Sequence, residues 1–71
     1  MSEEIFNMYY CYENSSSRTD VDFFEWRGTQ EEAQRAFKTA CAQYQTLIWA
    51  ELKNVSRGDI VIAEVDLRED G

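Results

Sequence analysis

Residues 29–44 carry the strongest local signal in this chain, a helix start followed by one apolar stripe. Thr29-Gln30-Glu31-Glu32 is a capping box, in which the Thr29 hydroxyl accepts from the Glu32 amide and the Glu32 carboxylate accepts from the Thr29 amide. Apolar residues then recur at three- and four-residue steps: Ala33, Ala36, Phe37, Ala40, Cys41 and Tyr44. This stripe predicts one amphipathic helix, whose alanines let it lie close to a sheet.

Stretches with a two-residue alternation lie on both sides of this helix. Residues 5–13 place Phe6, Met8, Tyr10 and Tyr12 on one face, and residues 60–67 do the same with Val61, Ala63, Val65 and Leu67. Residues 21–27 are rich in β-formers, but either Phe24 and Trp26 or Val21 and Phe23 could point to the core. A polar loop at 14–20 and a turn at 54–59 favour two hairpins.

The segment after the helical stripe allows two interpretations. Ile48 and Leu52 would continue the stripe, which allows one long helix over 30–54. Residues 46–49 are rich in strand formers, which favours a break near Gln45 and a strand over 46–53. We favour the break and the strand.

These elements predict a single α+β domain over residues 1–71. Its expected architecture is ββαββ, a four-stranded antiparallel sheet with one helix on one face; the alternative is ββαβ with a long helix over 30–54. One helix leaves the other sheet face uncovered. That face would carry a subset of Tyr9, Cys11, Phe23 and Ile48 or Trp49, and exposed apolar area of this kind indicates a partner or a dimer.

The charge of the chain restricts the class of partner. Fourteen acidic and seven basic residues give a net charge of −7, which disfavours direct binding of nucleic acid or of anionic membranes. A protein with a basic surface is the partner that this charge favours. The residues expected to meet it combine exposed aromatic and acidic side chains: Tyr9, Asp20, Asp22, Phe23, Trp49, Glu51, Glu64 and Asp66.

The residue types that most catalytic sites require are scarce. The chain has no His, two distant Cys and three Gly, so it lacks a His base, a CxxC site and a phosphate loop. Glu31 and Glu32 form an acidic pair that capping explains. We therefore expect no catalytic site, no cofactor and no metal. We expect the larger aromatics to be core residues: Tyr10, Tyr12, Phe24, Trp26, Phe37 and Tyr44. Residues 1–4 lack an apolar signal core, so the cytoplasm is the expected location.

The order of these segments also supports a family resemblance. The strand 22–27 runs directly into the helix start at 28–36, and a strand over 60–65 follows near the end. This arrangement resembles small ββαββ proteins of bacteriophages and mobile elements, among them several anti-CRISPR proteins. The resemblance implies a non-catalytic inhibitor in a host cytoplasm that docks on the nucleic-acid-binding site of a host protein, such as a CRISPR effector. The alternative is a small structural module that forms a homodimer through its open sheet face.

Overall fold

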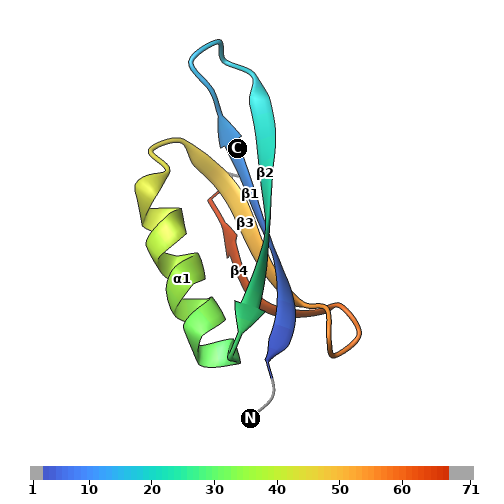
Figure 1. Ribbon diagram of the computed structural model, residues 1–71. Coiled ribbons are helices and arrows are strands. Elements are labelled where there is room, and N and C mark those ends of the chain that lie inside the picture. The colour runs from blue at the N-terminus through green and yellow to red at the C-terminus, as the bar shows by residue number, and fades with distance from the viewer. Residues whose placement is uncertain (1–2, 68–71) are drawn as a thin grey trace.

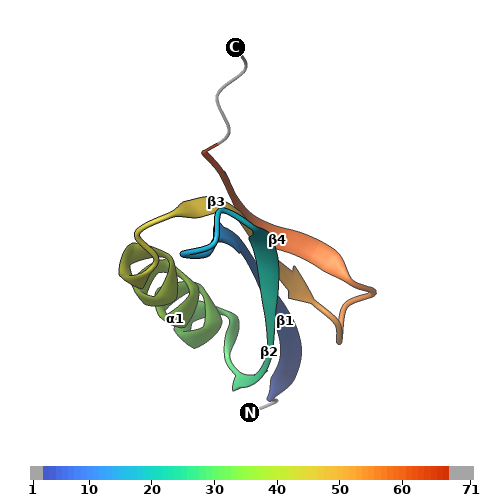
Figure 2. The ribbon, with the colours of Figure 1, turned by 90° about the horizontal axis from the view of Figure 1, so that it is seen from above.

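The computed structural model describes residues 3–67, which form four strands and one helix (Figure 1). The elements are β1 (Glu4–Glu13), β2 (Thr19–Gly28), α1 (Gln30–Gln43), β3 (Leu47–Asn54) and β4 (Ile60–Asp66). The strands form one antiparallel sheet of order β2-β1-β3-β4, and α1 lies against one of its faces (Figure 2). The predicted ββαββ architecture is therefore confirmed.

The alternative of a long helix over residues 30–54 is wrong. The helix α1 ends at Gln43, and Tyr44 already has an extended backbone with φ −86° and ψ 119°. The following residues pair as β3 with both β1 and β4. Residues 47–54 become a central strand because pairing on both sides satisfies their backbone groups, and their β-forming side chains fit the pleated surface.

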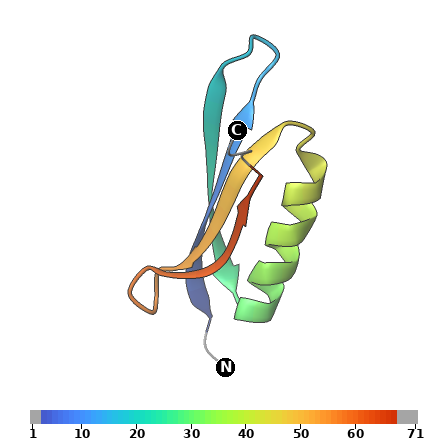
Figure 3. The ribbon, with the colours of Figure 1, turned by 180° about the vertical axis from the view of Figure 1, so that it is seen from behind.

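The two hairpins differ in regularity. The β1–β2 ladder has ten consecutive pairs, from Glu4–Gly28 to Glu13–Thr19, with no register shift. The loop of this hairpin extends well beyond the end of α1 (Figures 1 and 3). The β3–β4 ladder shifts register between Leu52 and Lys53. This bulge leaves Val61 46% exposed and lets Ile62 pack against the core, so the predicted apolar face at 60–67 is wrong at Val61.

The core lies between α1 and the sheet. It consists of Phe6, Met8, Tyr10, Ala33, Phe37, Ala50 and Leu52. The predicted alternation of β1 is confirmed, because Phe6, Met8 and Tyr10 belong to this core; Cys11 is also buried but lies outside the cluster. Met8 pairs with Phe24 and Phe6 pairs with Trp26, so these two β2 residues point to the side of α1.

The prediction that all the larger aromatics are core residues holds in part. Tyr10 and Phe37 are buried, whereas Tyr12, Trp26 and Tyr44 are half-buried. Phe24 is 51% exposed, so its assignment to the core is wrong. It lies on the edge strand β2, where no further strand shields it.

The helix α1 has 14 residues and is neither long nor apolar enough to cross a membrane; it is the single helix of residues 3–67. Met1 and Ser2, which contribute to the expectation of a cytoplasmic location, lie outside the described residues.

Candidate protein-binding face

The sheet face opposite α1 carries a group of apolar side chains. Because side chains alternate along a strand, residues that pair with the odd-numbered residues of β1 share this face. Tyr9 pairs with Phe23, and Cys11 pairs with Val21 on one side and Trp49 on the other. No helix or strand within residues 3–67 covers them (Figure 2). We call these five residues the open-face patch.

The open-face patch is partly ordered by its own contacts. The ring centroids of Tyr9 and Phe23 are 5.2 Å apart at an interplanar angle of 45°. Lys53 Nζ lies 5.7 Å from the centroid of the Tyr9 ring and 3.6 Å from Glu51 Oε1. Despite these contacts Val21 is 52% and Phe23 is 55% exposed. Cys11 is buried, and Tyr9 and Trp49 are half-buried. The part of the patch that is open to solvent therefore lies mainly on Val21 and Phe23.

Carboxylates border this patch on the side of β4. Glu51 of β3 lies directly opposite Glu64 of β4, and Trp49 lies opposite Asp66. Like charges placed directly opposite each other in an antiparallel pair are destabilising. Lys53 offsets part of this repulsion through its ion pair with Glu51. A cationic group from another molecule would reduce the repulsion further.

The structure brings together six of the eight residues predicted to bind a partner. Six share the open face: Tyr9, Phe23, Trp49, Glu51, Glu64 and Asp66. Asp20 and Asp22 pair with Tyr12 and Tyr10, so they point to the side of α1 instead. The alternation within β2 separates them from Phe23.

Asp22 has a structural role on the α1 side. Its carboxylate accepts hydrogen bonds from the hydroxyl of Tyr44, at 2.7 Å, and from that of Tyr12, at 3.5 Å. Burial, with Asp22 as the hydrogen-bond acceptor, raises the pKa of Tyr44. Burial also raises the pKa of Tyr10 to about 12, and its ring stacks on Tyr44 at 5.2 Å. These tyrosines remain neutral at physiological pH and join α1 to the sheet.

Sequence reasoning missed Val21 and Lys53 as members of this face. Val21 is two residues from Phe23, so both side chains lie on the same face of β2. The alternation would have identified Val21 once the inward face of β2 was known. Lys53 reaches Tyr9 through the β1–β3 register, which pairs Asn7 with Lys53. No local sequence signal encodes that register.

Within residues 3–67, no group of three or more Cys, Asp or Glu side chains is placed to hold a metal ion. The two cysteines are free, with Cys11 buried and Cys41 half-buried on α1. Burial raises the pKa of the Cys41 thiol, which disfavours the reactive thiolate. Comparison of the chain with protein-family models, with curated proteins and with solved structures gave no match in any of the three.

Proposed function

We propose that this chain is a non-catalytic binding protein that docks through its open sheet face on a basic surface of another protein. The observation that carries the proposal is the open-face patch beside Glu51, Glu64 and Asp66. Protein interfaces combine an apolar, aromatic centre with a polar border, and their binding energy is concentrated in a few central anchors. Phe23 and Trp49 are suited to that central role.

The charge of the molecule supports a basic partner. A net charge of −7 attracts a cationic surface and accelerates the encounter with it. The opposed pair Glu51–Glu64 gives this attraction a local target, because a Lys or Arg placed between the two carboxylates would relieve their repulsion.

The same charges disfavour the alternative of a homodimer that stacks open face on open face. Such a dimer would bring the acidic border of one copy close to that of the other, and like charges across an interface reduce affinity. Docking on a basic partner avoids this cost.

Proteins that bind nucleic acid carry basic surfaces, which this acidic face would attract. We therefore propose, in line with the resemblance to anti-CRISPR proteins, that the chain is a phage-encoded inhibitor that competes with nucleic acid for a host protein such as a CRISPR effector. A face with both aromatic and acidic groups could occupy a groove that otherwise holds a phosphate backbone.

The proposal can be tested with purified CRISPR effector complexes. Binding of the full chain would be measured by biolayer interferometry at several salt concentrations, together with competition against target DNA. Two variants alter the open face: Trp49→Ser and the double substitution Glu51→Gln/Glu64→Gln. The matched control Glu31→Gln/Asp59→Asn removes the same charge from exposed sites on α1 and in the turn before β4.

We expect each open-face variant to weaken binding about 10-fold or more, which corresponds to about 1.4 kcal/mol, and we expect the control to bind like the wild type. Wild-type binding should compete with DNA and weaken with salt. Equal weakening by the control would show that total charge, rather than this face, governs binding. Binding without competition would contradict the inhibitory mechanism.

A further inference from the structure

The outer edge of β2 presents backbone groups in a regular row. At the end of the β1–β2 hairpin, the Asn14 amide donates to the Arg18 carbonyl at 2.7 Å. The Glu13 amide instead donates to the Thr46 carbonyl, just before β3, at 3.1 Å. Even-numbered residues of β1 therefore bond to β2, and odd-numbered ones bond to β3. The alternation directs the amides and carbonyls of the odd-numbered residues of β2 away from β1. These residues are Thr19, Val21, Phe23, Glu25 and Arg27.

The two edges of the sheet differ in how they resist pairing with another chain. The edge strand β4 has seven residues, a bulge in its ladder and the charges of Glu64 and Asp66. Short length, bulges and charges are devices that protect an edge. The edge strand β2 also carries charges, at Asp20, Asp22, Glu25 and Arg27, but it has ten residues in an unshifted ladder and contains no Pro. Its apolar centre is exposed, with Val21 at 52% and Phe23 at 55%.

The sequence of β2 also fits itself in the antiparallel register that is centred on Phe23. When Phe23 faces Phe23 of a second copy, Val21 faces Glu25, and Thr19 faces Arg27. On the α1 side, the opposed residues are Asp22 with Phe24 and Asp20 with Trp26. No carboxylate faces another carboxylate in this arrangement, whereas a shift of the centre to Asp22 or to Glu25 would oppose two like charges. The Phe23 register also uses all five outward-facing residues.

We propose that two copies of this chain pair β2 to β2 about a two-fold axis at Phe23 and so form one eight-stranded antiparallel sheet. The interface is isologous, because each copy supplies the same strand. Both α1 helices lie on one side of the joined sheet. The two open-face patches meet at Phe23 on the other side and form one continuous aromatic surface. This dimer uses the strand edge, so it does not require the docking proposed above.

The oligomeric state of the full chain tests this proposal directly. Light scattering coupled to size exclusion would be recorded from about 10 μM to about 1 mM, the range that covers weak to moderate affinity. The mass should rise from 8.4 kDa toward twice that value. Val21→Glu places a carboxylate opposite Glu25 of the second copy in this register, and Val61→Glu makes the same change at a similarly exposed site on β4.

We expect Val21→Glu to be monomeric over this range and Val61→Glu to dimerise like the wild type, with circular dichroism confirming that both are folded. Trp49→Ser, which alters the open face, should retain the dimer mass. A wild type that is monomeric at about 1 mM would overturn the proposal, as would a dimer that Val21→Glu leaves intact. Loss of the dimer in Trp49→Ser alone would assign it to the open face instead.

Hydrogen exchange followed by NMR gives a second, residue-level measurement. The amides of Val21, Phe23 and Glu25 should exchange slowly at high protein concentration, and the amides at these three positions should exchange rapidly in Val21→Glu. The amides of Asp22 and Phe24 bond to β1 in either state and serve as internal controls. Rapid exchange of the three outward amides in a wild-type dimer would overturn the pairing. Because Trp49→Ser should remove docking on a basic partner but retain the dimer, failure of either proposal can be recognised separately.

Discussion

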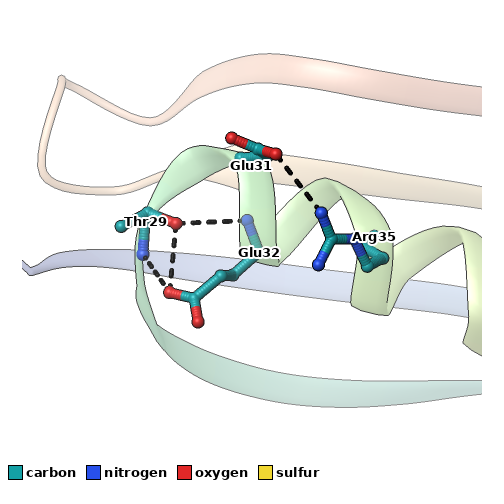
Figure 4. Close-up of polar contacts among 4 residues, drawn as sticks. All are labelled: Thr29, Glu31, Glu32 and Arg35. Atoms are coloured by element: carbon teal, nitrogen blue, oxygen red, sulfur yellow. Dashed lines mark hydrogen bonds and ion pairs between the residues drawn. The ribbon is translucent and has the colours of Figure 1, made fainter.

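At the scale of single residues, Thr29 and Glu32 determine where α1 begins. The Glu32 amide donates to the Thr29 hydroxyl at 3.2 Å, and the Thr29 amide donates to the Glu32 carboxylate at 3.2 Å (Figure 4). Glu31 forms an ion pair with Arg35 at 3.2 Å, but both side chains are largely exposed, so this pair adds little. The reciprocal bonds satisfy amides that the helix itself leaves without partners.

We expect Thr29→Ala to lower the free energy of unfolding by about 1 kcal/mol, because it removes the side-chain cap. Urea unfolding followed by circular dichroism would measure the change. Thr39→Ala is the matched control, since Thr39 lies in the exposed interior of α1, where its hydroxyl bonds only to the Arg35 carbonyl. A larger loss for Thr39→Ala than for Thr29→Ala would contradict this account of the cap.

The same cap predicts a dependence on pH. Hydrogen bonds from Thr29 hold the pKa of Glu32 below its ordinary value of 4.5. A carboxylate with a lowered folded-state pKa stabilises the protein above about pH 4.5, and this contribution is lost as the pH falls through the folded-state pKa. Glu32→Gln keeps the capping geometry but cannot titrate. Its unfolding free energy should therefore fall less than that of the wild type between pH 6 and pH 3, measured by urea unfolding; an identical fall would refute the role of Glu32.

At the scale of elements, the tie between α1 and the edge strand β2 depends on Asp22 and Tyr44. The 2.7 Å hydrogen bond from the Tyr44 hydroxyl to the Asp22 carboxylate joins the end of the helix to the strand. Tyr44 also stacks on Tyr10 and lies 5.2 Å from the Tyr12 ring. The Phe24 ring meets the Tyr10 ring edge-on at 5.8 Å, but Phe24 is half exposed and adds little burial here.

A double-mutant cycle with Asp22→Ala and Tyr44→Phe would measure this tie, because each substitution removes one partner of the hydrogen bond. We expect a coupling free energy of about 1 kcal/mol, since a hydrogen bond to a charged group is worth more than a neutral one but this site is only partly buried. Tyr12→Phe, which loses the longer 3.5 Å contact with Asp22, should couple more weakly. Coupling indistinguishable from zero for Tyr44 would show that ring packing alone holds α1 in place.

At the scale of the whole molecule, the negative charges repel one another. The chain has fourteen acidic and seven basic residues. The ion pairs Glu25–Arg27 and Glu31–Arg35 are exposed, whereas Glu51–Lys53 is half-buried and Glu4 is largely buried in its pair with the exposed Arg57. Salt screens repulsion between exposed charges over about 10 Å at 0.1 M.

We expect the free energy of unfolding at pH 7 to rise when the NaCl concentration increases from about 0.02 M to about 0.3 M, because screening of the net charge outweighs the loss of exposed ion pairs. Urea unfolding at a fixed protein concentration would measure this change, with sucrose at equal osmolality as the control for non-ionic effects. A fall in stability with salt would show that the ion pairs dominate.

Local sequence signals were sufficient for much of the fold. The cap at Thr29, the stripe through Phe37 and the alternation through Tyr10 each depend on residues within a few positions of one another, and all three are confirmed. The secondary structure of residues 46–53 was harder to predict, because their apolar residues fit both the helical period of about 3.6 residues and the strand period of two. Its strand state depends on the long-range partners β1 and β4.

The sequence by itself determined the element types outside residues 46–53, the single covered face and the negative charge, because these follow from short-range periodicity and composition. The tertiary structure alone decided the strand order, the bulge that exposes Val61 and the separation of Asp22 from Phe23. The physical reason is register. A one-residue shift in strand pairing moves a side chain to the opposite face, and that pairing is fixed by contacts between residues far apart in the chain.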